Sequence, residues 1–571
     1  MHQDTKVCRT EEAVISLSPA QKRQPHVIVP VILVAAVMML AGVALSPFAA
    51  SEESEDDMPE IRGEVAFANF FGGSGTDFFY TVTATSDGGF VAAGYSAAAS
   101  FGNGDWTDVT GHGNTDAIIV KFDIDGNIVW KKHFGGSNTD YFYAVTATPD
   151  GGFVAVGASG SFGNGDWTGV TGRGNQDATI VKFDADGNIV WKKNFGGSAL
   201  DRFNAVTATP DGGFVAAGTS EAASFGNGDW VGVTGRGNND AIIVKFDNDG
   251  NTIWKKNFGG SGDDHFKAVT ATSDGGFVAA GYSSLPSFGN GDWTGVTGRG
   301  GSDAIIVKFD NDGNTIWMKH FGGSAPDYFN AVTATPDGGF VAAGYSSTDS
   351  FGNGDWIDVT GRGGQDAIIV KFDADGNVVW KKNFGGSDGD YFNAVTATPD
   401  GGFVAAGYSL PTSFGNGDWT DPKRFMARGG QDAIIVKFDA DGNVIWKKHF
   451  GGSSADYFNA VTATTDGGFV VVGDSNTSSF GTGDWTGVTG RGSTDAIIVK
   501  YTEVVDENGG DGCDCAEPQD NETSLIAAGI TIGGSVFATL SALALGTSRH
   551  PYALLCIGLG FILILTGVFI L

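Results

Sequence analysis

Cysteine is scarce in this sequence, and the long middle of the chain has none. The 571 residues include only four cysteines, Cys8, Cys513, Cys515 and Cys556. A fold formed by the residues between them needs no disulfide, as expected of a chain long enough to bury a large core. Cys513 and Cys515 form an isolated C-D-C pair with no second pair of ligands, so they do not indicate a zinc site.

Basic residues are also few. Lysine and arginine number 34 against 66 aspartates and glutamates, which gives a formal net charge of −32. Nucleic acids and anionic lipid headgroups require a basic surface, so we predict that neither is a partner. The acidic balance suits a soluble, self-repelling exterior and leaves cation binding open.

Common catalytic motifs are missing as well. The sequence contains no G-x-S-x-G, H-E-x-x-H or phosphate-binding loop. Its eight histidines are scattered. Those in the middle of the chain stand where equivalent segments carry other residues, and they are His112, His133, His265, His320 and His449. We therefore predict that the protein is not an enzyme, with a hydrolase or lyase kept as an alternative.

What the chain does have is a unit repeated seven times. The string F-G-G-S begins at Phe71, Phe134, Phe195, Phe258, Phe321, Phe384 and Phe450, mostly 63 residues apart. Between these points the same phrases return in order: A-V-T-A-T, an aspartate–glycine turn, D-A-I-I-V-K-F and W-K-K. A unit of this length cannot bury both of its faces alone, so it must stack on its neighbours.

One unit illustrates the strands that the pattern predicts. Residues 378–384, 392–398, 403–408 and 432–438 are short runs rich in β-branched and aromatic residues. The P-D-G-G segment at 399–402 is a hairpin turn, in which glycine supplies the positive φ. Four antiparallel strands in each of seven units predict an all-β fold, a seven-bladed β-propeller.

The two ends of the array predict how the ring closes. Residues 64–71 match the W-K-K strand but have no D-A-I-I-V-K-F strand before them. Residues 495–501 match D-A-I-I-V-K-F but have no W-K-K strand after them. We therefore expect the first segment to complete the last blade, which leaves no open sheet edge.

These phrases resemble the propeller repeats of uncharacterised archaeal and bacterial cell-surface proteins, in which V-K-x-D-x-x-G-N-x-x-W is followed by F-G-G and T-x-D-G-G. The strand order is also similar to that of NHL-type propellers, and the resemblance covers roughly residues 60–502. It implies that A-V-T-A-T is the innermost strand and W-K-K the outermost, and it implies no reaction. Small residues suit the crowded axis, and paired lysines suit a guarded outer edge.

Long apolar runs are confined to the two ends of the chain. Residues 27–46 follow a basic leader and are long enough for an uncleaved signal-anchor, although Ala49, Ala50 and Ser51 are also typical of a signal-peptide cleavage site. Residues 525–545 and 552–571 are of membrane-spanning length, and the link between them contains Arg549 and His550. We predict two transmembrane helices there, with the repeats on the extracellular side of the cell membrane.

The predicted organisation follows from these runs. It consists of a cytoplasmic basic leader (1–26), a signal-anchor or signal peptide (27–46), an acidic linker (51–60), the propeller (61–502), an acidic glycine-rich linker (503–524) and the two transmembrane helices (525–545 and 552–571). The linkers lack the apolar residues that a folded segment would bury.

One face of the predicted propeller is more elaborate than the other, because the longer loops share it. Each of these loops carries a tryptophan beside Asp and, in the first six, Asn: Trp106, Trp167, Trp230, Trp293, Trp356, Trp419 and Trp485. These seven tryptophans are candidate ligand-binding residues, since their indole rings would stack on sugars as in a multivalent lectin. The alternative is that each tryptophan pins its own loop to the blade.

Two families of aspartates recur in the same repeats. One follows G-G-S, and the other opens the D-A-I-I-V-K-F strands. We expect both to accept backbone N–H groups and to fix loop shape, and we predict no cofactor. Calcium is the alternative, because oxygen-rich loops suit a hard cation.

The sequence therefore predicts a membrane-anchored extracellular propeller that acts as a binding or adhesion module. Carbohydrate or another surface polymer is the expected ligand, on the face that carries the tryptophans. A structural cell-surface scaffold with no small ligand is the alternative.

Overall fold

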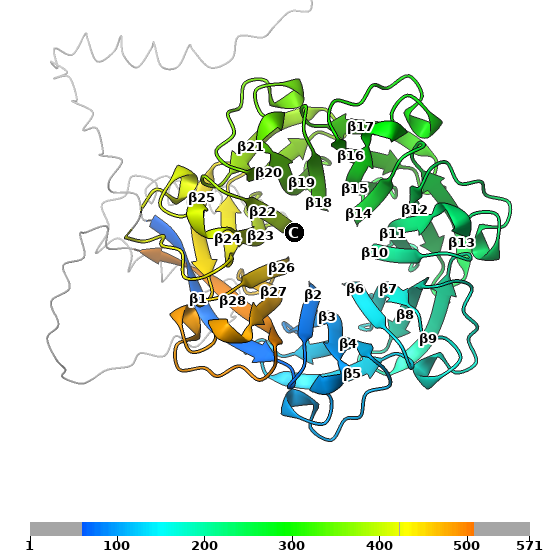
Figure 1. The fold of residues 1–571 in the computed structure, drawn as a ribbon, viewed down its shortest axis with the longest axis horizontal. Helices are drawn as coiled ribbons and strands as arrows, with labels where there is room; N and C mark the ends of the chain where they lie inside the picture. Colours follow the sequence, from blue (N-terminus) through cyan, green and yellow to red (C-terminus); the bar gives the residue numbers. More distant parts are fainter. Residues whose placement is uncertain (1–59, 422, 507–571) are drawn as a thin grey trace, which may run out of the picture. The chain divides into compact units, whose positions relative to one another are not determined.

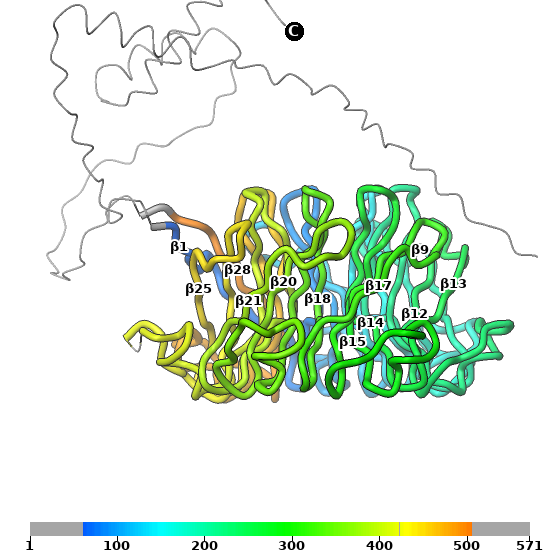
Figure 2. The backbone as a smooth tube through the Cα atoms, turned by 90° about the horizontal axis from the view of Figure 1, so that it is seen from above, coloured from blue at the N-terminus to red at the C-terminus, as the bar shows by residue number. Residues whose placement is uncertain are grey.

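The computed structural model describes residues 60–421 and 423–506, and these residues form the predicted seven-bladed β-propeller (Figure 1). Each blade is a four-stranded antiparallel sheet. The innermost strands of neighbouring blades contact one another around the whole ring, including those of the first and last blades. Figure 2 shows the propeller edge-on, with loops at two opposite faces.

The strands of a blade follow one another outward from the axis, as predicted. The innermost strands are β2 (Asp77–Ala84), β6 (Asp140–Ala147), β10 (Asp201–Ala208), β14 (Asp264–Ala271), β18 (Asp327–Ala334), β22 (Asp390–Ala397) and β26 (Asp456–Ala463). The second strands are β3 (Phe90–Ala97), β7 (Phe153–Ser159), β11 (Phe214–Glu221), β15 (Phe277–Ser284), β19 (Phe340–Ser347), β23 (Phe403–Ser409) and β27 (Phe469–Asn476).

The third and fourth strands complete each sheet. The third strands are β4 (Thr115–Phe122), β8 (Asp177–Phe183), β12 (Asn239–Phe246), β16 (Ser302–Phe309), β20 (Gln365–Phe372), β24 (Asp432–Phe438) and β28 (Thr494–Asp506). The outermost strands are β5 (Ile128–Phe134), β9 (Ile189–Phe195), β13 (Thr252–Phe258), β17 (Thr315–Phe321), β21 (Val378–Phe384), β25 (Val444–Phe450) and β1 (Glu60–Phe71).

The predicted closure of the ring is confirmed. The last sheet has the order β26-β27-β28-β1, so the first strand of the chain is the outermost strand of the last blade. The pairing begins at Glu60 with Asp506 and ends at Phe71 with Ala496. Residues 60 and 503–506 therefore belong to this sheet, whereas the sequence predicts linkers at these positions. The sheet is longer than expected because β1 pairs with β28 along its whole length, so that the backbone groups of the two strands hydrogen-bond to each other.

The core lies between adjacent blades rather than within one. Val91, Ala93 and Ile119 of the first blade pack in one cluster with Phe142 and Val145 of the second. Side chains on both faces of the second and third strands are buried, which explains their nearly unbroken apolar sequence. Strand β22 begins at Asp390, two residues earlier than predicted, because Asp390 pairs with Ser409 of the second strand, and the innermost strands of the other blades also begin at an aspartate.

The predicted segments 1–26, 27–46, 525–545 and 552–571 lie outside the described residues, as do most residues of both linkers. In the part of the chain that the structure describes, no helix has the length and apolar character needed to cross a membrane. The described helices are all short 3-10 turns in the long loops.

Ion pairs reinforce both faces. On the face with tight turns, the lysine of each third strand contacts the turn aspartate at 2.5–2.7 Å, as in Lys121 with Asp87. On the long-loop face, six arginines reach the G-D-W aspartate of the next blade, as in Arg173 with Asp229 at 3.1 Å. The second set joins neighbouring blades.

Candidate functional site at the axis

The long loops are compact and hold their tryptophans by 3-10 turns. The G-D-W turns are η3 (Gly104–Trp106), η4 (Gly165–Trp167), η6 (Gly228–Trp230), η8 (Gly291–Trp293), η10 (Gly354–Trp356), η12 (Gly417–Trp419) and η14 (Gly483–Trp485). A preceding turn is present in every blade but the second: η2 (Ala98–Ser100), η5 (Ala222–Ser224), η7 (Leu285–Ser287), η9 (Thr348–Ser350), η11 (Pro411–Ser413) and η13 (Thr477–Ser479). The second blade has the shortest long loop, as the sequence indicates.

The seven loop tryptophans are buried. Trp106, Trp167, Trp230, Trp293, Trp356 and Trp419 are 0% exposed, and Trp485 is 1% exposed. Each indole packs edge-on against the phenylalanine of F-G-G-S, with ring centroids 4.8–5.3 Å apart. Each Nε1–H donates to a buried serine or aspartate of its own blade.

These contacts make each tryptophan a support for its own loop. Stacking on a sugar would require an exposed face of the indole, and the loops would have to open to provide one. The role of these residues in ligand binding stays a prediction that their burial does not favour.

The recurring aspartates fix the loops, as expected. The family after G-G-S accepts the N–H of a loop glycine at 2.8–2.9 Å: Asp77, Asp140, Asp201, Asp264, Asp327, Asp390 and Asp456. The second family accepts the N–H of the residue four positions earlier at 2.7–2.9 Å: Asp116, Asp177, Asp240, Asp303, Asp366, Asp432 and Asp495. Their oxygens already serve these donors.

The sequence D-P-K-R-F-M-A-R at 421–428 departs clearly from the repeat. Phe425 in this loop packs against Trp419, with ring centroids 5.1 Å apart, and is 6% exposed. Lys423 is exposed. The insertion therefore adds cover over the tryptophan of its own blade.

A different set of residues surrounds the axis at the long-loop end. We call it the axial ring: the residue after the first aspartate of each innermost strand, with its partner on the second strand. It consists of Phe78 and Tyr95, Tyr141 and Ala158, Arg202 and Thr219, His265 and Tyr282, Tyr328 and Tyr345, Tyr391 and Tyr408, and Tyr457 and Asp474.

The axial ring is mainly aromatic, and its tyrosines are half-buried. His265 stacks on Tyr282 with ring centroids 4.7 Å apart, and Tyr282 meets Tyr328 of the next blade at 4.8 Å. Similar contacts continue through the remaining blades to Tyr408 and Tyr457, whose centroids are 4.9 Å apart. The axial ring thus brings aromatic edges and hydroxyl groups from several blades together around the propeller axis.

A β-bulge places a second layer of side chains below the axial ring. The fourth residue of every innermost strand is unpaired, because the register shifts there. A bulge of this kind re-aims a side chain. In four blades the bulged residue is an asparagine that donates to the next blade, as in Asn204 to the Phe266 carbonyl at 2.8 Å. The glycine beside each bulge is required: a Cβ on Gly94 would lie 1.9 Å from the Phe78 carbonyl oxygen.

Three basic residues on the innermost strands β10 and β14 lie near enough to influence one another electrostatically. Arg202 and His265 belong to the axial ring, and Lys267 is the bulged residue of β14. Burial, together with the charges of Lys267 and Arg202, lowers the pKa of His265 to about 3. Burial and Arg202 lower the pKa of Lys267 to about 8. Like charges therefore lie close together here in a chain whose net charge is −32.

An acid lies on the opposite side of the axis. Asp474 on β27 is 4% exposed and accepts the Asn459 side-chain N–H at 3.0 Å. Burial raises its pKa to about 7, with a smaller contribution from Asp456. The innermost strand of this blade, β26, lies across the axis from β10 and β14 (Figure 1). The axial ring is thus basic on one side and carries a weakly acidic group on the other.

The axial residues are not evident from the sequence alone. His265 is one of several scattered histidines, and no recognised motif contains Arg202 or Lys267. The available signal was the segment after the first aspartate, which is Y-F-N in three repeats but R-F-N at 202–204 and H-F-K at 265–267.

Comparisons with known proteins add little beyond the architecture. No family model matches the chain. The regulatory protein FlaEY of Caulobacter vibrioides is 24% identical over 263 residues, which are 42% of this chain and 26% of FlaEY. The chain therefore matches about a quarter of the length of that relative.

Solved structures with similar arrangements are more distant. The Pan2 WD40 domain of Neurospora crassa is 10% identical, with a TM-score of 0.40 over 76% of this chain and 91% of that domain. Sqt1 of Chaetomium thermophilum is 12% identical, with a TM-score of 0.36 over 73% of this chain and 82% of that protein. Function must therefore be argued from the site itself.

Proposed function

We propose that this protein is a binding module that holds the anionic group of an acidic carbohydrate at the axial ring. We also propose that its terminal apolar segments anchor it in the cell membrane with the propeller outside. The second part is supported by the sequences of residues 27–46, 525–545 and 552–571. The first part is supported by the side chains on β10 and β14.

The observation that carries the proposal is a pair of buried side-chain nitrogens without hydrogen-bond partners. Within residues 60–421 and 423–506, neither Arg202 Nε nor His265 Nδ1 has a hydrogen-bond partner. Leaving such groups unsatisfied is costly, and clustering them with a third basic residue, Lys267, adds repulsion. A carboxylate or sulfate placed between them would accept the Arg202 Nε–H, would accept from His265 when its Nδ1 carries the ring proton, and would offset that repulsion.

The surroundings favour a sugar as the carrier of that anion. Half-buried tyrosines such as Tyr95, Tyr141 and Tyr282 offer ring surface together with hydroxyl groups. Sugars present apolar ring faces and hydroxyls in the same combination. An acidic peptide is the competing ligand, and the experiment distinguishes the two.

The test is a calorimetric titration of the purified full-length protein with uronate-containing and sulfated oligosaccharides, neutral oligosaccharides, and an acidic peptide. The site variant is Arg202→Tyr, His265→Tyr and Lys267→Asn, which gives blades three and four the residues that blades five to seven already carry. The control variant is Lys131→Asn, Lys132→Asn and Lys192→Asn, which removes basic side chains from the outermost strands.

We expect saturable binding of the acidic oligosaccharides, no binding of the neutral ones, and at least a tenfold loss of affinity in the site variant alone. Binding of the acidic peptide without the oligosaccharides would move the assignment to a protein partner. Equal binding by the site variant, or no binding of any anion, would overturn the axial site and favour a structural scaffold.

Asp474 supports a second candidate function, a lyase or hydrolase acting on the same ligand. A carboxyl group whose pKa is about 7 is suited to general acid–base work near neutral pH. The Asp474→Asn variant would then bind an acidic polysaccharide normally but release no oligosaccharides from it. Absence of product from the unaltered protein would exclude this candidate and leave the binding function in place.

A further inference from the structure

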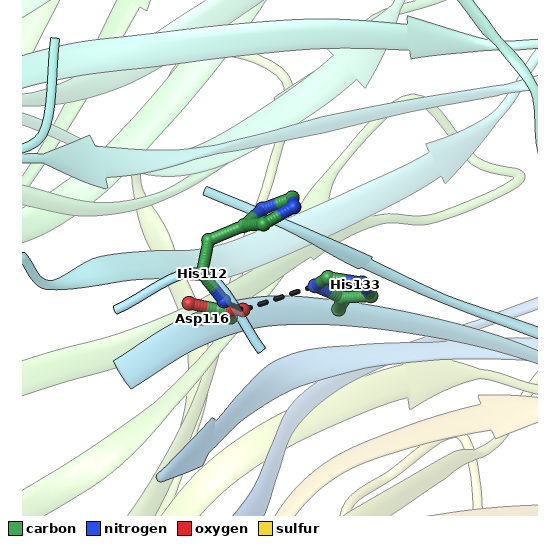
Figure 3. A group of neighbouring side chains, drawn as sticks. All are labelled: His112, Asp116 and His133. Carbon is green, nitrogen blue, oxygen red and sulfur yellow. Dashed lines mark hydrogen bonds and ion pairs between the residues drawn. The ribbon is translucent and has the colours of Figure 1, made fainter. Parts of the chain in front are cut away.

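Two histidines and an aspartate meet in the first blade, away from the axial ring (Figure 3). His112 lies in the long loop between η3 and β4, Asp116 is the second residue of β4, and His133 is the sixth residue of β5. One donor atom from each residue lies within 4.8 Å of the others. We propose that these three residues bind a divalent transition-metal ion of the zinc class.

The donor set and its spacing fit such an ion. His133 Nδ1 lies 3.0 Å from Asp116 Oδ2, and the two imidazole rings have centroids 4.6 Å apart. Ligands bound at about 2.0–2.2 Å in a tetrahedral zinc site lie roughly 3.3 Å from one another. The histidine and aspartate donors are therefore near the required separation. Two imidazoles with one carboxylate favour zinc-class ions over calcium, which prefers oxygen ligands alone.

The carboxylate is already held in a fixed orientation. Asp116 is 0% exposed and accepts the backbone N–H groups of His112 at 2.7 Å and Gly113 at 3.1 Å. The His112 side chain is 34% exposed, so an ion can reach the cluster from solvent. The site is thus rigid on the carboxylate side and open on the side of one imidazole.

A fourth group comes from the next blade. Asp166 Oδ2 lies 3.3 Å from His112 Nδ1 and also accepts the Gly135 N–H at 3.0 Å. A carboxylate that accepts Nδ1–H orients a metal-binding imidazole and leaves its Nε2 for the ion. A bound ion would therefore connect the first blade to the second through His112.

The other blades provide a built-in comparison. Where the first blade has His112, the others have Arg173, Arg236, Arg299, Arg362, Arg428 and Arg491. The fourth blade retains the histidine–aspartate pair, with His320 Nδ1 2.8 Å from Asp303 Oδ2, but places Arg299 beside it. Within the described ranges, only the first blade brings a second imidazole to the pair.

The experiment titrates Co²⁺ and Zn²⁺ into the full-length protein after treatment with chelator and alkylation of its four cysteines. Alkylation removes the thiolates, which would otherwise compete as ligands. Co²⁺ is the spectroscopic probe, because a low-symmetry nitrogen–oxygen site gives intense visible absorption. The test variants are His112→Arg and His133→Asn, and the matched control is His320→Asn in the fourth blade.

We expect one equivalent of Co²⁺ to give saturable visible absorption and Zn²⁺ to displace it. We expect His112→Arg and His133→Asn to weaken binding by at least about tenfold and His320→Asn to leave it unchanged. His112→Arg reproduces the arrangement of the fourth blade, so a folded variant is expected, and circular dichroism verifies it. Absorption that is absent in the unaltered protein, or that persists in folded His112→Arg, would overturn the proposal.

Discussion

Arg491 of the last blade donates to the Asp105 carboxylate of the first blade, across 386 positions of sequence. Asp105 Oδ2 also accepts the Gly72 N–H at 3.0 Å. The same contact joins neighbouring blades elsewhere, as in Arg173 with Asp229. The junction at which the ring closes therefore uses the same polar contact as five of the six junctions within the continuous chain, the exception being His112 with Asp166 between the first two blades.

Because the Arg491–Asp105 and Arg173–Asp229 ion pairs are alike, removing the aspartate of either one should lower the free energy of unfolding by the same amount. Asp105→Asn and Asp229→Asn should each lower the free energy of unfolding by about 0.5–1 kcal/mol, because these pairs are partly exposed and screened by solvent. Urea denaturation followed by fluorescence measures both. A loss at Asp105 several times that at Asp229 would show that the closing junction depends on its ion pair more than the others do.

The loop tryptophans should contribute to stability. Trp293 is 0% exposed, and its Nε1–H donates to Ser283 Oγ at 3.0 Å. Trp293→Ala should therefore lower the free energy of unfolding by about 3–5 kcal/mol, and Trp293→Phe by less than half as much. Chemical denaturation gives the two values. A near-neutral Trp293→Ala would mean that the loop does not depend on the indole.

Removing the aspartate of a lysine–aspartate pair should lower the free energy of unfolding more than removing the lysine does. Lys437 Nζ contacts Asp400 Oδ2 and Thr398 Oγ1, each at 2.7 Å, and the lysine side chain is 1% exposed. Asp400→Asn leaves a buried ammonium without its charge partner, whereas Lys437→Met removes the charge. We expect Asp400→Asn to cost about 1–2 kcal/mol and Lys437→Met less than 1 kcal/mol, since Asp400 is half exposed. The reverse order in urea denaturation would contradict this account.

Stability should have a maximum in mildly acidic solution. Burial raises the pKa of Asp327, Asp390, Asp432 and Asp495 to about 6, so these groups add stability when protonated and lose that contribution as pH rises through 6. Hydrogen bonds from lysines lower the pKa of the turn aspartates such as Asp87 to about 2, and that contribution is lost as pH falls toward 2.

The melting temperature should therefore rise as pH falls from 7 to about 5 and decrease again below about 4. Differential scanning fluorimetry across this range measures the curve. In Asp327→Asn the rise should be smaller, because one of the raised groups is gone. A melting temperature that only falls between pH 7 and 5 would contradict the assignment of the buried aspartates.

Much of the fold could be predicted from the sequence because local signals and the repeat agree. Strands β21 and β24 have the bounds predicted, since turn residues flank their β-branched runs on both sides. The sequence predicts the start of β22 two residues too late, because the pairing of Asp390 with Ser409 depends on a contact between strands. The extension of β28 to Asp506 likewise depends on a partner more than 400 residues away.

The candidate site was harder to predict than the fold. The G-D-W loops have the same sequence whether the indole faces solvent or the blade, and only the packing against Phe258 and its equivalents decides between the two. Arg202 and Lys267 are 65 positions apart, and their proximity depends on adjacent innermost strands and on a bulge. The departure of two repeats from Y-F-N was visible, but its location at the axis was not.

The pairing of β1 with β28 also determines how the propeller responds to tension. Glu60 pairs with Asp506, so the two ends of the described fold leave the same edge of the same blade. A force that pulls these ends apart would load one pair of hydrogen bonds at a time, from Glu60–Asp506 inward to Phe71–Ala496. We expect the last blade to peel open before the other blades are strained, because the β1–β28 pairing bears the load first.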